Sequence, residues 1–187
     1  MRSSLIGVAL ALVASVGVRP AAAQRRAPAP GMWAIGGSIG ASAPTDPSLD
    51  SGLDLAGNVE RYVTSRVSVR GQLAVGWWDI VGRHFTGTVS PVSLDGNIVY
   101  NWEGGKWHPY ATGGVGMYRY RSNETLVPNG ADTTVGLNVG GGVEYFFTRR
   151  STVTGEALYH GVGAFNTPLT TFKGSFWTVA GGLKHYF

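Results

Sequence analysis

Charged and polar side chains recur at alternate positions along this chain, and their types define the chemistry that it could carry out. The set comprises Asp54, Glu60, Arg70, Gln72, Asp95, Glu144, Glu156 and Lys184. In an extended strand, such alternation places side chains of one kind on one face. If that face is enclosed, the charges must pair or share water, because an unpaired buried charge is costly. The pattern therefore predicts a buried polar network, with a polar path for ions or small solutes as the alternative.

The histidines do not form a catalytic or metal-binding pattern. His160 is followed by the segment 161–163, Gly-Val-Gly, and His84 has no partner at a recognisable spacing. The chain contains 4 His and 0 Cys, which gives no ligand spacing typical of a metal site. We therefore predict no catalytic residue, no metal site and no cofactor.

Eight segments alternate apolar residues with small or polar ones, and we predict that they are the strands that carry these side chains. They are 32–43, 53–62, 67–78, 91–102, 107–120, 133–146, 151–160 and 175–187. Short turns alternate with longer loops at 44–52, 79–90, 121–132 and 161–173, a sorting that a soluble sandwich does not require. A soluble barrel would turn its apolar face inward, whereas here the charges lie on the small-residue face. This arrangement is typical of a membrane barrel.

The segment 107–120 is compatible with either facing. If Ala111, Val115 and Met117 face lipid, Arg119 faces lipid as well. With the opposite facing, the tyrosines of the segment lie at the interfaces and Arg119 enters the lumen. An inward Arg119 would add a third base to a set in which acids outnumber bases. We therefore predict that Arg119 belongs to the lumen network.

Aromatic residues gather near the ends of the predicted strands, which is typical of anchorage at two membrane–water interfaces. They are Trp33, Tyr100, Trp102, Trp107, Tyr145, Tyr159, Trp177 and Phe187. Because no segment after the N-terminal region is a continuous apolar run of helical spanning length, a bilayer crossing would require a closed barrel.

Two hairpins repeat within the chain, since residues 57–72 align without gaps on residues 141–156 and share the pattern Gly-x-Val-Glu. With the segment 109–116 and the terminal Gly-x-x-x-x-Phe, they make the chain resemble the small eight-stranded outer-membrane barrels of the OmpA, OmpX and opacity-protein type. The resemblance implies an all-β fold, an eight-stranded antiparallel up-and-down transmembrane β-barrel over residues 32–187. It also implies that Gly182 and Phe187 form a signal for the outer-membrane assembly machinery.

The resemblance implies a location in the bacterial outer membrane, with both termini in the periplasm. We expect a structural or surface-interaction role through the extracellular loops, with the lumen plugged by side chains. A narrow pore is one alternative, and a lipid A-modifying hydrolase is the second. The expected partners are outer-membrane lipids and the assembly machinery, and no extracellular partner is identified. We expect a monomer that does not bind nucleic acid, because the positive charge is mild and the chain is exported.

Residues 1–23 are predicted to be a secretory signal peptide, with Arg2, an apolar run from Leu5 to Val18 and three alanines before Gln24. Removing it lowers the formal net charge from +4 to about +2. The Pro-rich residues 24–31 are predicted to be a flexible periplasmic tail.

N-terminal sequencing of the protein recovered from outer membranes should begin at Gln24, because the alanines precede it in the order that signal peptidase requires. An uncleaved chain in the inner membrane would contradict this prediction.

Overall fold

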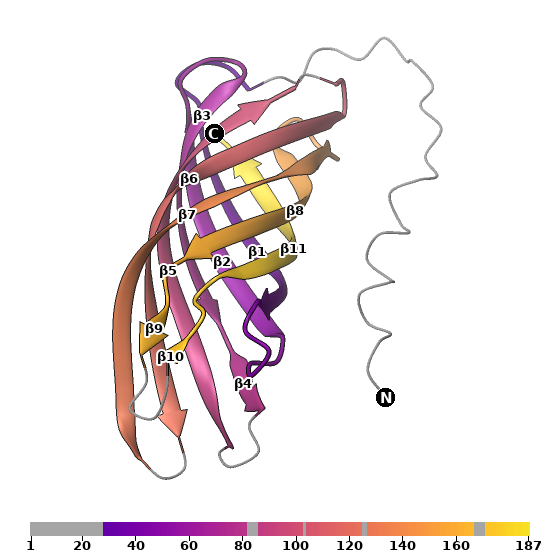
Figure 1. Cartoon of the computed structure of the whole chain (residues 1–187). Coiled ribbons are helices and arrows are strands. Elements are labelled where there is room, and N and C mark those ends of the chain that lie inside the picture. The colour runs from indigo at the N-terminus through magenta and orange to yellow at the C-terminus, as the bar shows by residue number, and fades with distance from the viewer. Residues whose placement is uncertain (1–27, 82–85, 103, 125–126, 167–170) are drawn as a thin grey trace.

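The strands of this protein form one continuous antiparallel sheet that curves into a barrel (Figure 1). The computed structural model describes residues 28–81, 86–102, 104–124, 127–166 and 171–187. The sheet contains β1 (Trp33–Pro44), β2 (Gly52–Tyr62), β3 (Val67–Gly76), β4 (Trp78–Val81), β5 (Thr86–Asn101), β6 (Trp107–Glu124), β7 (Val127–Phe146), β8 (Ser151–Val162) and β11 (Phe176–Tyr186). A separate short hairpin consists of β9 (Phe165–Asn166) and β10 (Thr171–Phe172).

Two pairings close the sheet into a ring. The first strand, β1, pairs with both β2 and the last strand, β11, and β3 pairs with β5. The short β4 follows β3 after an interruption at Trp77 and continues its pairing with β5. When β3 and β4 are taken as one strand, the barrel has eight strands, and the predicted fold class is confirmed.

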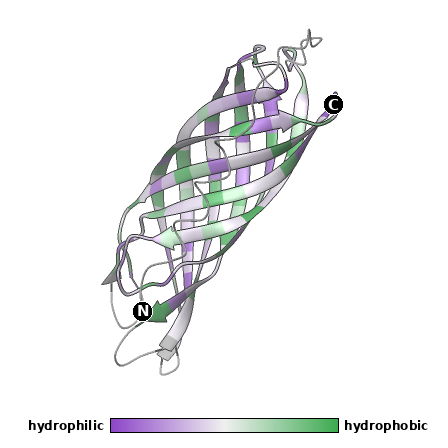
Figure 2. Ribbon diagram, turned by 90° about the vertical axis from the view of Figure 1, so that its right-hand side faces the viewer, coloured by the Kyte–Doolittle hydropathy of each residue, from purple (hydrophilic) through white to green (hydrophobic). Residues whose placement is uncertain are grey.

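Polar and apolar residues alternate along the strands because the two faces of the sheet meet different surroundings (Figure 2). The outward face carries exposed apolar side chains such as those of Ile35, Ile39, Leu55, Leu73, Leu94, Ile98, Val115, Leu137, Val153, Val179 and Leu183. The inward face buries charged and hydroxylated side chains. This inside-out pattern suits a barrel whose outer surface is covered by lipid. Among the described residues, no helix is long and apolar enough to cross a membrane.

Two of the long loops that we predicted are largely strand, so those predictions were wrong. The region 79–90 contains the end of β4 and the start of β5, and the region 121–132 contains the end of β6 and the start of β7. The β6–β7 ladder continues to the pair Glu124–Val127. The apolar alternation stops at the edge of the membrane band, but backbone pairing continues beyond it because both neighbouring strands persist.

The predicted inward facing of Arg119 was also wrong. The structure exposes Arg119 on the outer face of β6 and buries Tyr110, Tyr118 and Tyr120 in the lumen. The tyrosine hydroxyls find acceptors there, because Tyr118 donates to Asp95 Oδ1 at 2.8 Å and Tyr110 donates to Glu156 Oε2 at 2.8 Å. Arg119 is the next outward residue of β6 after Met117, at the edge of the apolar stretch. The free-energy cost of exposing a charge to lipid is small at such an edge.

Residues 28–31 are the described part of the predicted tail, and they lie against the end of the barrel that carries the C-terminus. Pro28 is buried, and Gly31 N donates to Tyr62 O at 2.7 Å. Gly31 adopts a positive φ of 86°, a conformation that glycine allows without strain. The predicted signal peptide, 1–23, lies outside the described residues.

Deleting Phe187 should lower the yield of protein in the outer membrane and leave unfolded protein in the periplasm. The deletion removes the expected assembly signal and the two backbone bonds between Trp33 and Phe187, of 2.9 and 3.1 Å, that extend the β1–β11 seam. Immunoblots of membrane and periplasmic fractions would measure this effect.

The matched variant for this deletion is Phe187→Ala, which keeps the backbone bonds and removes only the ring. A loss confined to the deletion would assign the effect to backbone pairing. Unchanged yield for both variants at native expression would remove the assembly-signal interpretation.

Candidate functional site

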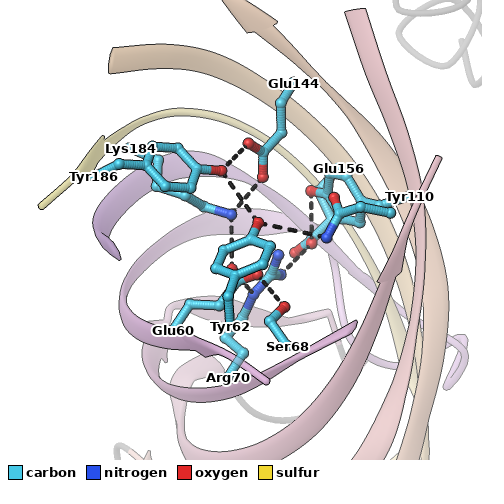
Figure 3. A network of polar contacts seen from close by, with 10 residues as sticks. Glu60, Tyr62, Ser68, Arg70, Tyr110, Glu144, Glu156, Lys184 and Tyr186 are labelled. Atoms are coloured by element: carbon cyan, nitrogen blue, oxygen red, sulfur yellow. Dashed lines mark hydrogen bonds and ion pairs between the residues drawn. The ribbon is translucent and has the colours of Figure 1, made fainter. Parts of the chain in front are cut away.

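A network of ion pairs fills the lumen near the end that carries the C-terminus (Figure 3). The Nζ of Lys184, on β11, contacts Glu60 Oε2 at 2.7 Å and also bonds Glu144 Oε1. Arg70, on β3, holds Glu60 Oε2 through Nε at 3.2 Å and Glu156 Oε2 through Nη1 at 2.5 Å. Two cations therefore share three carboxylates from three strands, and nearly all of these side chains are buried.

The pairing across the lumen differs in part from the expectation. The hairpin repeat predicts that Glu60 pairs with Arg70, and the order of the strands predicts Lys184 as the nearest cation for Glu144 and Glu156. The structure contains the Glu60–Arg70 and Lys184–Glu144 contacts. We also expected Lys184 to neutralise Glu156, but Arg70 does so from the opposite side of the ring. An eight-stranded interior is narrow enough for one long side chain to reach across it.

Aromatic residues close the lumen at this end. Tyr62, Phe146 and Tyr186 form a buried cluster with Ala34, and Met32 packs against it. The Tyr186 hydroxyl donates to Glu144, and the Tyr62 and Tyr186 hydroxyls are 3.3 Å apart. The aromatic floor is thus joined to the ion-pair network by hydrogen bonds, so the two stabilise one another.

A second polar layer surrounds Asp95 in the middle of the lumen. Its carboxylate accepts hydrogen bonds from Ser93 at 2.7 Å, Tyr118 at 2.8 Å and Asn138 at 3.2 Å. His160 lies beside it, with Nδ1 3.0 Å from the Tyr118 hydroxyl. Within the described part of the chain, no lysine or arginine contacts Asp95. Neutral hydrogen-bond donors therefore stabilise its buried carboxylate.

A cavity of about 10 Å³ lies next to this layer and is lined partly by Asp54 and Gln72. It has room for about one water molecule. In the described part of the chain, no cluster of three or more His, Asp or Glu could hold a metal ion.

A hydrophobic cluster closes the opposite end of the lumen. Trp78, Tyr120 and Phe176 pack there with the two phenylalanines of the β9–β10 hairpin, Phe165 and Phe172. Tyr120 stacks on Phe165 with ring centroids 4.0 Å apart, and its hydroxyl donates to Gly174 O at 2.6 Å. The sequence reasoning missed this cap because it assigned 161–173 to a loop. The two phenylalanines in this one segment, Phe165 and Phe172, were the available signal.

The structure places the predicted lumen residues in these layers, with one exception. Asp54, Glu60, Arg70, Gln72, Asp95, Glu144, Glu156 and Lys184 point inward, whereas Arg119 points outward. Gly182 lies at the β1–β11 seam, where an added Cβ would be 2.5 Å from Gly37 O. Close approach of the strands therefore requires glycine at this position, whatever its role in assembly.

The predicted interfacial aromatics all lie on the outer face in two groups. Near the end with the C-terminus are Trp33, Tyr100, Trp102, Trp107, Tyr145 and Phe187, and toward the other end are Tyr159 and Trp177. Tyr159 and Trp177 contact each other, with ring centroids 5.0 Å apart. Trp77 is also exposed and lies between β3 and β4, toward the same end as the second group. It was not among the predicted residues.

A closed ring of strands with an apolar outer band and a charged, filled interior defines an integral membrane barrel. The chain belongs to the outer membrane protein beta-barrel domain family, whose model matches residues 8–185. This membership supports a location in the outer membrane. A search of curated proteins finds no match.

Solved structures show the same fold at low sequence identity. OprG from Pseudomonas aeruginosa is 14% identical, with a TM-score of 0.66 over 88% of this chain and 99% of that one. Neisserial surface protein A is 12% identical, with a TM-score of 0.63 over 83% and 97%. Ail of Yersinia pestis, solved with the heparin analogue sucrose octasulfate, is 12% identical, with a TM-score of 0.61 over 84% and 99%.

Replacing Lys184 by Met should lower the free energy of unfolding by about 3–5 kcal/mol, because it leaves the Glu144 carboxylate buried without its cation. Urea titration of the protein folded in detergent or lipid would measure the loss.

Glu144→Gln should recover part of this loss in the double variant, since it removes the stranded charge. Glu156→Gln is the matched control, because Glu156 pairs with Arg70 and should show little coupling to Lys184. Equal coupling to both glutamates, or none to either, would contradict the network as described.

Proposed function

We propose that this protein is a plugged, non-catalytic outer membrane barrel that acts through the surface at the end opposite its termini, with both termini in the periplasm. The observation that carries this proposal is that side chains close the lumen at three levels. The aromatic floor, the ion-pair network and the hydrophobic cap each bury their members.

A pore is disfavoured by the same packing. A solute would have to separate Lys184 from two carboxylates and displace the stacked rings of Tyr120 and Phe165. Breaking a buried ion pair costs about 3–5 kcal/mol. A narrow pore would require these groups to rearrange together.

A hydrolase is disfavoured by the environments of His160 and His185, whereas His84 lies outside the described residues. His160 is buried and bonds Tyr118 and Thr178, and no serine among the described residues hydrogen-bonds it. On the outer face, His185 bonds Ser151 Oγ through Nδ1 at 3.0 Å, but the two residues are direct partners in the β8–β11 ladder. Regular strand pairing uses the backbone N–H groups that an oxyanion hole would need.

The lengths of the strands support the proposed orientation. Turns 63–66 and 147–150 are short and lie at the end with the C-terminus, whereas β5, β6 and β7 extend well past the apolar band at the other end. Bacterial barrels typically have short periplasmic turns and longer extracellular extensions. The heparin analogue belongs to Ail, and 12% identity gives no basis for assigning that ligand here.

Single cysteines would test orientation and closure together, because the native chain has none. On intact cells, a large impermeant maleimide should label Ala164→Cys, which is exposed near the capped end. Thr64→Cys, in an exposed short turn, should react only after the outer membrane is opened. The reverse pattern would overturn the orientation.

A lumen position tests the plug in the same protein. Thr112 is buried on the inward face of β6, so Thr112→Cys should resist a small thiol reagent in the folded, purified barrel and react after unfolding. Rapid reaction in the folded state would contradict the plugged lumen and favour the pore.

A further inference from the structure

An apolar groove of about 720 Å³ lies on the outer face of β5, β6 and β7. Its walls include Leu94, Val115, Met117, Val135 and Leu137, all of which are strongly exposed.

Glycine shapes this groove at both sides. Adjacent strands align Gly96, Val115, Leu137 and Gly161 in one row across the sheet, so two large apolar residues lie between two glycines. Gly96 and Gly161 line the groove. A Cβ added at Gly96 would meet no atom within 4 Å, so the space above this position is open. A depression between apolar side chains suits an extended acyl chain.

Two arginines lie on the same face of β6, directly beyond the groove. The outward residues in order are Val115, Met117, Arg119 and Arg121, and both arginines are exposed. Successive residues on one face of a strand are about 7 Å apart, so one headgroup could contact both guanidinium groups.

No acid neutralises either arginine within the described part of the chain. Their strand neighbours on the outer face are Val92 and Ser90 on β5, and Thr133 and Ala131 on β7. An unneutralised guanidinium pair at the edge of an apolar band is complementary to phosphate, which arginine binds through two parallel hydrogen bonds.

We propose that this face binds a phosphate-bearing acyl lipid of the lipid A type, with one acyl chain in the groove and a phosphate at Arg119 and Arg121. This proposal depends on the proposed function only for the choice of membrane leaflet. With both termini in the periplasm, the rim that carries Arg119 and Arg121 lies in the outer leaflet. The opposite rim offers a different arrangement, because the exposed Arg61 lies over the Trp33 ring, 5.3 Å from its centroid.

Native mass spectrometry of the folded, full-length mature protein in detergent would test the site with phosphorylated lipid A and its dephosphorylated form. The wild type should retain one phosphorylated lipid and bind the dephosphorylated form at least roughly tenfold more weakly, as expected for the loss of charge-assisted hydrogen bonds. Arg119→Gln with Arg121→Gln should reduce binding of the phosphorylated lipid by a similar factor. Arg61→Gln should bind it as the wild type does.

The groove has its own matched pair of variants. Gly96→Phe should fill the groove and weaken binding of the lipid, whereas Gly71→Phe should not. Gly71 is the exposed neighbour of Gly96 on β3, has equally open space and does not line the groove. Circular dichroism would verify that every variant is folded.

Several outcomes would overturn the proposal. Equal binding of the two lipid forms, or equal loss in the Arg61 and Arg119/Arg121 variants, would reject the phosphate site. Equal effects of Gly96→Phe and Gly71→Phe would reject the groove. Displacement of the lipid by inorganic phosphate at matched concentration would indicate a free-phosphate site instead. Because binding in detergent does not depend on orientation, its failure is distinguishable from failure of the cysteine labelling.

Discussion

Backbone hydrogen bonding in a medium without water is the constraint on which this structure depends. Each N–H and C=O group within the lipid must find a partner inside the sheet, and only a closed ring provides one for every strand. The pairings of β1 with β11 and of β3 with β5 complete that ring. Once the ring is closed, the register of each strand decides which side chains face lipid and which enter the lumen, because a shift of one residue exchanges the two faces.

The narrow interior that results must then accommodate more acids than bases. Arg70 and Lys184 serve Glu60, Glu144 and Glu156 jointly, so that each cation contacts two carboxylates. Asp95 is stabilised by hydroxyl and amide donors instead. Inward tyrosines are central to this solution, because a phenol fills space as an aromatic ring and still donates a hydrogen bond. An inward Arg119 would have added charge but lost the hydroxyls of Tyr118 and Tyr120 from the lumen.

The two ends of the barrel differ in construction. At the end with the C-terminus, the aromatic floor is bonded to the ion-pair network. At the other end, β5, β6 and β7 extend beyond the apolar band, and the β9–β10 hairpin places Phe165 and Phe172 in the cap. The same extension carries Arg119 and Arg121 just past the apolar groove. The long strands thus carry residues of both the hydrophobic cluster at this end and the charged rim on the outer surface.

The sequence by itself determined the eight strands within the apolar band, most of their inward charges and the outward position of the strand-end aromatics, because a period of two is a local property that alternating residues display directly. It did not show that β5, β6 and β7 continue beyond that band. It left the facing of β6 undecided, since tyrosine suits both an interface and a lumen. Only the tertiary structure decided that facing, the Arg70–Glu156 contact across the ring and the phenylalanine cap. Each of these joins residues far apart in the chain, and their proximity follows from ring closure and from the folding back of the β9–β10 hairpin, which no local pattern contains.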